Sequence, residues 1–309
     1  MKLLNFDLKS KIGFINTLKK TWTTFLHSIK FVIKVVLNAI NFFNKDKAPV
    51  TAAGLAYYAV FSLFPLLLVL IAGGSLFFEK AVAEQQIQEY IDTFFPFSSN
   101  FILGNLSSVL ELRGTIGIIS AVALLWSSTT FFHILVRSIN IAWIGSAPRA
   151  YFKSRLLGLG IVAVFGFMLI LSFFSKTLLN LLSHFEVPIF GSINLYTTVI
   201  WKLISDILPL MINFLMFWGL YFVAPNTRVD MKAALFGSIV TTTLWEILSK
   251  GFRFSLQNGF LNYQLVYGSL GTVILLMFWL YLSFIVILLG AYLSSSFCTT
   301  KIDKLIILN

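Results

Sequence analysis

Residues 268–297 read GSLGTVILLMFWLYLSFIVILLGAYLSSSF, an apolar run without a charged side chain. An α-helix rises about 1.5 Å per residue, so about 20 such residues cross the hydrocarbon core of a bilayer. Five further runs of this kind precede it, at residues 51–78, 114–135, 156–182, 198–223 and 232–254. The sequence therefore predicts an all-α, polytopic membrane protein with six transmembrane helices.

The composition supports lipid as the solvent for most of the chain. Hydrophobic residues make up 58% of the sequence and charged residues 11%, and the mean hydropathy is +0.89. Soluble globular domains carry about 25% charged residues. The composition thus argues against a water-soluble globular protein.

The basic residues are distributed unevenly between the two sides of the predicted membrane domain. Of the 23 Lys and Arg residues, 17 lie in the N-terminal segment, near the loops after the second and fourth spans, or in the C-terminal tail. Because cytoplasmic segments carry an excess of Lys and Arg, this bias predicts that both termini are cytoplasmic. The net charge of +11 is interpreted as this topology signal plus attraction to anionic lipid headgroups on the cytoplasmic side. No nucleic-acid partner is expected, because the chain has no basic soluble domain.

Three regions follow from this reading: a cytoplasmic N-terminal segment at 1–47, a six-helix transmembrane domain at 48–298 and a cytoplasmic tail at 299–309. Within the first region, residues 21–44 carry an apolar helical stripe, with Lys30 and Lys34 off it. The stripe consists of Phe25, Ile29, Val32, Ile33, Val36, Leu37, Ile40 and Phe43. This pattern favours an amphipathic helix in the inner membrane interface. A short seventh span is the alternative, which the two lysines disfavour.

Four sequence blocks carry a family resemblance. They are AAGLAYYAVFSLFPL at 52–66, LWSSTTFFHILVRSINIAW at 125–143, PNTRVDMKAALFG at 225–237 and YGSLGTVILLMFWLYLSFIVILLGA at 267–291. Together they resemble the YihY/BrkB family of inner-membrane proteins, sometimes labelled ribonuclease BN-like. The resemblance implies a six-helix protein of the bacterial inner, or cytoplasmic, membrane. Many relatives have an acidic residue after the Gly-Ala of the last span, where this chain has Tyr292.

Two acidic residues fall inside predicted spans, where a charge is costly and often functional. Asp206 lies in the fourth span and Glu246 in the fifth, at similar depth in the outer half of the membrane. Lys202 and Lys250 lie one helical turn from them, and Pro209 predicts a kink beside Asp206. Two interpretations stay open: each acid is neutralised by its lysine at a packed helix interface, or the four residues form a polar pocket for a headgroup or a coupling proton.

The first span carries a second polar set. Tyr58, Ser62 and Pro65 share one helical face at positions i, i+4 and i+7. Helix packing explains this face, with a kink at Pro65, and a polar wall of the substrate pocket, formed by Tyr58 and Ser62, is the alternative.

Three residues near the predicted inner surface are candidates for contact with a lipid phosphate. Arg137 and Asn140 lie at the inner end of the second span, and Arg228 follows Pro225-Asn226 in the next inner loop. A guanidinium group suits phosphate oxygens because its N–H groups form a fork. For Arg228, anchoring by the positive-inside rule explains the position equally well.

Enzymatic chemistry finds little support in the residue pattern. The histidines, His27, His133 and His184, lie on different segments, and Cys298 is the single cysteine. The sequence thus predicts no metal site, no cofactor and no catalytic residue, and a ribonuclease activity is not expected. The favoured function is a transporter or flippase of an amphiphilic, lipid-like solute. A non-transporting scaffold or envelope-maintenance protein is the alternative, and a membrane-embedded enzyme is less favoured.

Overall fold

The computed structural model describes residues 29–74, 118–143, 145–150, 152–161, 163–164, 167–168, 199–259 and 270–307. Every regular element in these ranges is a helix, so the all-α prediction is confirmed for the described chain. The labelled helices are α2 (Ala48–Gly74), α5 (Ile118–Ile141), α7 (Val199–Val223), α8 (Met231–Gln257) and α10 (Leu270–Ile307). Residues 29–45 and 152–161 are also helical.

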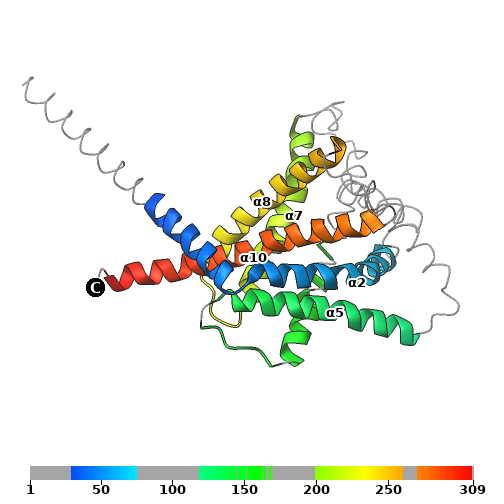
Figure 1. The fold of residues 1–309 in the computed structure, drawn as a ribbon, viewed down its shortest axis with the longest axis horizontal. Helices are drawn as coiled ribbons and strands as arrows, with labels where there is room; N and C mark the ends of the chain where they lie inside the picture. Colours follow the sequence, from blue (N-terminus) through cyan, green and yellow to red (C-terminus); the bar gives the residue numbers. More distant parts are fainter. Residues whose placement is uncertain are drawn as a thin grey trace, which may run out of the picture.

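Helix α10 is the centre of the bundle (Figure 1). It packs against α8 and α2, α2 packs against α5, and α7 packs against α8. In Figure 1, α10, α2 and α5 run side by side along the long axis. At 38 residues α10 is the longest of these helices, and its C-terminal part extends beyond the bundle.

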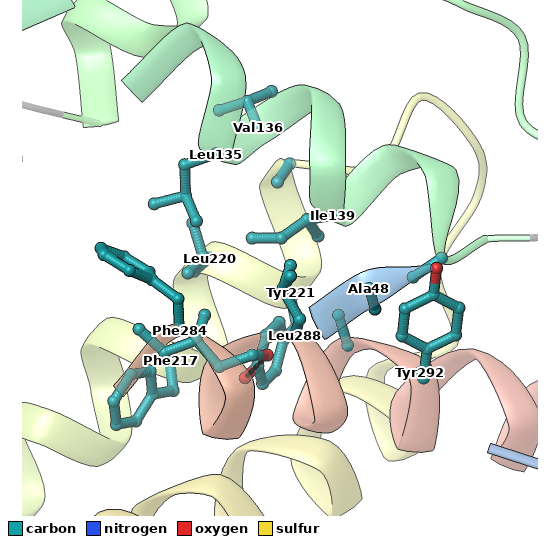
Figure 2. Close-up of a cluster of buried hydrophobic side chains, with 14 of the residues drawn as sticks. Ala48, Leu135, Val136, Ile139, Phe217, Leu220, Tyr221, Phe284, Leu288 and Tyr292 are labelled. Atoms are coloured by element: carbon teal, nitrogen blue, oxygen red, sulfur yellow. Dashed lines mark hydrogen bonds between the residues drawn. The ribbon is translucent and has the colours of Figure 1, made fainter. Parts of the chain in front are cut away.

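The core and the outer surface of the bundle are both apolar. Figure 2 shows side chains from α2, α5, α7 and α10 converging in the core, where Ile139 and Tyr221 are fully buried. Hydroxyl side chains are buried among them, including Ser238 and Thr241 on α8. Large apolar side chains face outward, as Phe61 does on α2. Such extensive apolar exposure is unusual on a soluble monomer, and it fits an apolar solvent around the bundle.

One helix among the described residues, Leu270–Lys301, is both long and apolar enough to cross a bilayer. The segments Thr130–Ile141 and Ile207–Val223 are apolar but shorter. The helices α2, α5, α7 and α8 contain 24–27 residues each, and each overlaps one predicted span. The third predicted span, at 156–182, is described only in its first part.

Helices α8 and α10 approach each other closely at two glycines. A Cβ on Gly237 would lie 2.7 Å from the carbonyl oxygen of Gly290. A Cβ on Gly290 would overlap the hydroxyl oxygens of Thr241 and Tyr221. The Tyr221 hydroxyl lies 2.9 Å from Thr241 Oγ1 and donates to the carbonyl oxygen of Ile287 at 2.7 Å. Because these groups are buried, only glycine fits at both positions.

Helix 29–45 ends at a sharp break before α2. Lys47 adopts a positive φ of 53°, which is uncommon for a residue other than glycine. The Tyr292 hydroxyl of α10 donates to Asp46 Oδ2 at 2.9 Å, and the rings of Phe43 and Tyr292 meet edge to face at 5.7 Å. These contacts tie the break to α10.

Helix 29–45 has a packed face and an exposed apolar face. Val35 and Ala39 are buried, Phe31 meets Phe297 at 5.3 Å, and Asn38 lies on the same face. The exposed apolar side chains are Ile29, Val32, Ile33, Val36, Leu37 and Ile40. These six belong to the predicted amphipathic stripe, so most of the stripe is not used for packing within the chain, whereas Phe43 at its end packs against Tyr292.

The N-terminus of α8 is bound to the C-terminal part of α10. Asp230 is the N-cap of α8 and accepts from the Lys232 backbone N–H at 3.1 Å. Its other carboxylate oxygen accepts from the Lys301 ammonium group. The hydrogen bond from Lys301, followed by that from Lys232, lowers the pKa of Asp230. Helix α10 continues through this contact to Ile307.

Candidate functional site

A cavity of about 660 Å³ lies where the end of α5, the break at 45–47 and the segment after α7 meet. We call it the basic cavity, because its lining includes Lys45, Arg137 and Arg149. The carboxylate of Asp46 and the indole of Trp143 also line it.

The last turns of α5 contribute one wall of this cavity. Arg137, Asn140 and Ile141 all line it, because positions i, i+3 and i+4 share one face of a helix. Helix α5 ends at Ile141, and the chain then turns through Gly145, whose φ of +78° suits glycine. The segment 145–150 that follows also lines the cavity, through Ser146, Pro148 and Arg149.

Two asparagines hold that segment against the end of α7. The buried Asn140 accepts from the backbone N–H of Asn226 through Oδ1 at 2.6 Å. Its Nδ2 donates to the carbonyl oxygen of Ala147 at 3.3 Å. The Nδ2 group of Asn226 donates to the same oxygen at 3.1 Å. Asn140 is therefore a structural link whose side chain is already bonded.

Arg149 completes this set of contacts between the 145–150 segment and the end of α7, which we call the bracket. Its Nε donates to Asn226 Oδ1 at 3.2 Å, and one terminal nitrogen donates to the carbonyl oxygens of Val223 at 3.2 Å and Pro225 at 2.9 Å. Burial lowers the pKa of the Arg149 guanidinium from its ordinary value, but arginine stays charged at neutral pH. Arg149 thus supplies positive charge while its bonds position the loop.

Two other donors at the basic cavity are not used by the bundle. Within the described part of the chain, the side chains of Arg137 and Lys45 are exposed and have no hydrogen-bond or ion-pair partner. Trp143 is 5% exposed, and its indole nitrogen is buried, so the ring contributes a wall and no accessible donor. The cavity therefore offers an acceptor-bearing ligand two free cationic donors.

A second cavity of about 640 Å³ adjoins the first, and we call it the apolar cavity. Pro148 and Arg149 line both cavities. Leu156 and Leu157 from helix 152–161 and Val223 from the end of α7 form much of its lining. Lys153, Ala150, Gly160 and Asn226 complete the described lining.

The residues predicted for the outer pocket are only partly described. Glu246 lies 4.0 Å from Lys250, as the helical spacing predicts. The structure places Asp206, Lys202 and Pro209 on α7, but the side chains of Asp206 and Lys202 lie outside the described part. Neither cavity includes Glu246 in its described lining.

The polar residues of α2 point in different directions. Ser62 is buried and donates to the Ala59 carbonyl oxygen at 3.0 Å. Tyr58 is 41% exposed and meets Tyr57 edge to face at 5.6 Å. The side chain of Pro65 lies outside the described part. Neither Tyr58 nor Ser62 lines the basic or the apolar cavity.

Of the three predicted phosphate contacts, the structure brings two to the basic cavity. Arg137 and Asn140 line it, whereas Arg228 is exposed in the loop before α8 and is outside its described lining. The sequence alone does not point to Lys45, because only the fold brings the 45–47 break to the end of α5. Among the described residues, no group of three or more His, Cys, Asp or Glu side chains is placed to hold a metal ion.

Comparison with known proteins identifies the family. A family model described as "Virulence factor BrkB" matches residues 39–303. The chain belongs to the BrkB family. The match includes both cavities, and it confirms the resemblance seen in the four sequence blocks.

Individual BrkB-type relatives match over most of their length. A UPF0761 membrane protein of Aliivibrio salmonicida is 29% identical over 81% of this chain and 79% of its own. A UPF0761 membrane protein of Pseudoalteromonas translucida is 31% identical over 84% of both chains. The protein YfkH of Bacillus subtilis, named as ribonuclease-like, is 29% identical over 79% of this chain and 88% of its own. No solved structure matches this chain.

Proposed function

We propose that this BrkB family member is a multi-pass bacterial inner-membrane protein that transports an amphiphilic, lipid-like solute or flips it between leaflets. The observation that carries the proposal is the pair of adjoining cavities. The basic cavity suits the charged head of such a solute, and the apolar cavity, across Pro148 and Arg149, suits its hydrocarbon part.

The dimensions of the two cavities fit this use. Ligand pockets commonly measure about 300–1,000 Å³ and are largely apolar with a few placed polar groups. At about 660 Å³ and 640 Å³, each cavity has room for one end of an amphiphile. The bracket formed by Asn140, Asn226 and Arg149 keeps the shared wall in place.

The proposed topology has six spans, both termini in the cytoplasm and helix 29–45 in the inner interface. The contacts Asn38–Thr300, Asn140–Asn226 and Lys301–Asp230 support it, because they bring the four Lys- and Arg-rich segments to the same end of the bundle. The exposed apolar stripe of helix 29–45 and its flanking lysines suit an anionic membrane surface. The basic cavity then opens on the cytoplasmic side.

We also propose a second polar binding site in the outer half of the membrane, formed by Asp206 and Glu246. Helices α7 and α8 pack against each other, and α7 contains Pro209 three residues after Asp206. Interrupted helices near the midplane line the binding sites of several transporter folds. We propose that these two acidic residues, on two helices that pack against each other, bind the solute or a coupling proton.

We propose a non-enzymatic role. Among the described residues that line the basic cavity, Asp46 is the single carboxylate, and it already accepts from Tyr292. Nuclease chemistry with metal ions commonly uses clustered carboxylates. The residue set at this cavity is better suited to binding an anion than to cleaving one.

The test is flipping in reconstituted vesicles. Full-length protein is placed in liposomes with a fluorescent phospholipid analogue, and the fraction quenched by external dithionite is followed over time. We expect faster exchange than in protein-free liposomes, and loss of that acceleration in Asp206→Asn and Glu246→Gln at equal protein content. If both variants accelerate exchange as much as the wild type does, the site at Asp206 and Glu246 is rejected. If the wild type exchanges the lipid no faster than empty liposomes do, flipping of this lipid is rejected.

A further inference from the structure

The basic cavity carries more positive charge than its own residues neutralise. Lys45, Arg137 and Arg149 bring three cations, and Asp46 brings one carboxylate. With His133 neutral, the described lining has a net charge of about +2 at neutral pH. The Asp46 carboxylate is hydrogen-bonded to Tyr292. The remaining positive charge favours an anionic ligand whose negative charge matches it.

The free donors differ in chemistry. Arg137 presents a planar guanidinium fork, and Lys45 presents a compact ammonium group. Arg and Lys are the side chains most often used for phosphate recognition. A tetrahedral anion with three or more oxygens can accept from donors that come from several directions, whereas a carboxylate offers two oxygens in one plane.

We propose that the basic cavity is a binding site for a phosphate monoester, held by Arg137 and Lys45. The inference rests on the proposed function only in taking the phosphate to be the head of the amphiphile. A lipid phosphate and a soluble phosphate ester share this chemistry.

The net charge favours a monoester over a diester. A phosphate monoester carries about −1.5 to −2 charges at pH 7, with three free oxygens. A diester, as in phosphatidylglycerol, carries one negative charge and two free oxygens, so it leaves part of the +2 lining uncompensated. The cavity is therefore expected to discriminate between the two headgroups.

The experiment measures binding of short-chain lipids to the full-length protein in detergent by native mass spectrometry. Dioctanoyl phosphatidic acid is the monoester probe and dioctanoyl phosphatidylglycerol the diester probe. We expect phosphatidic acid to bind at least about tenfold more tightly, and Arg137→Gln to weaken it about ten- to hundredfold. The matched control is Arg253→Gln on α8, 22 residues from the start of that helix and outside the described lining.

A second variant guards against a folding defect in Arg137→Gln. Lys45→Gln removes one donor from a different segment and is expected to weaken phosphatidic acid binding by about threefold or more. Equal affinity for the two headgroups, or equal affinity in both variants and the Arg253→Gln control, would overturn the assignment. Competition by inorganic phosphate would show that soluble phosphate esters also enter, and its absence would show that the lipid tail is required.

The binding experiment and the flipping experiment test the phosphate site and transport independently. Tight binding of phosphatidic acid without flipping would reject transport and keep the phosphate site. Flipping by a wild-type protein that binds the two headgroups with equal affinity would keep transport and reject the phosphate site.

Discussion

The contact between α8 and α10 makes a quantitative prediction at Gly290. In Gly290→Ala the new methyl group overlaps the hydroxyl oxygens of Thr241 and Tyr221 and lies 3.0 Å from Tyr221 Cζ. Thr241 and Tyr221 are fully buried, so neither side chain can move into open space. Overpacking of this kind costs about 1–3 kcal/mol, and the upper end applies because two buried groups must shift.

Alanine has a higher helix propensity than glycine, by about 1 kcal/mol, which offsets part of the cost at Gly290. We therefore expect the Gly290→Ala variant to lose about 2 kcal/mol of unfolding free energy. Gly54→Ala on α2 is the matched control, because nothing lies within 4 Å of its new methyl group. It should leave stability unchanged or raise it by up to about 1 kcal/mol.

The assay is unfolding of the purified protein in mixed micelles by titration with sodium dodecyl sulfate, followed by circular dichroism. Tyr221→Phe removes one of the colliding oxygens, so Tyr221→Phe combined with Gly290→Ala should cost less than the sum of the single changes. A Gly290→Ala variant as stable as the Gly54→Ala variant would refute the close packing of α8 and α10.

Two further predictions concern the end of the bundle that holds the basic cavity. Because Lys301 lowers the pKa of Asp230, this contact stabilises the fold fully above the unfolded pKa of about 4 and is lost as pH falls through the lower folded value. Thermal unfolding between pH 3 and 7 should show this loss in the wild type, with a smaller pH dependence in Asp230→Asn; equal pH profiles would contradict it. Asn140→Ala leaves the Asn226 backbone N–H without its acceptor and removes one of the two donors to the Ala147 carbonyl oxygen. It should cost about 1–3 kcal/mol, measured by the same detergent titration. An unchanged midpoint in that variant would contradict the bracket.

Much of the helical framework could be predicted from the sequence, because apolar runs mark helices in a membrane protein. The predicted runs at 198–223 and 232–254 correspond to α7 at Val199–Val223 and α8 at Met231–Gln257. The run at 268–297 ends where the residues become polar, but α10 continues to Ile307. The end of the apolar run marks where the predicted surroundings of the helix change from lipid to water. The helix continues past that point because no glycine or proline ends it there.

The candidate site was harder to predict, because its parts come from distant segments. Arg137 and Asn140 stand out as polar residues at the end of an apolar run. The partner of Asn140 is Asn226, 86 positions away, and a single sequence contains no signal for that pairing. In the sequence, Lys45 is one of several lysines of the basic N-terminal segment, and nothing singles it out. Its place at the cavity depends on the break at Lys47.

Helix 29–45 shows a related limit of pattern analysis. Most described residues of the predicted stripe are exposed, whereas the face that packs inside the protein uses Val35, Ala39 and Phe31, all outside the stripe. Two apolar faces on one helix cannot be separated by periodicity alone, because periodicity does not indicate which face contacts protein and which contacts lipid.

A structure determined in lipid nanodiscs that contain phosphatidic acid would show whether this lipid occupies the basic cavity. We expect a phosphate group within hydrogen-bond distance of Arg137 and Lys45, with its acyl chains passing Pro148 toward Leu156. A basic cavity that stays empty of lipid phosphate at saturating phosphatidic acid, or phosphate bound at Arg228 instead, would contradict it.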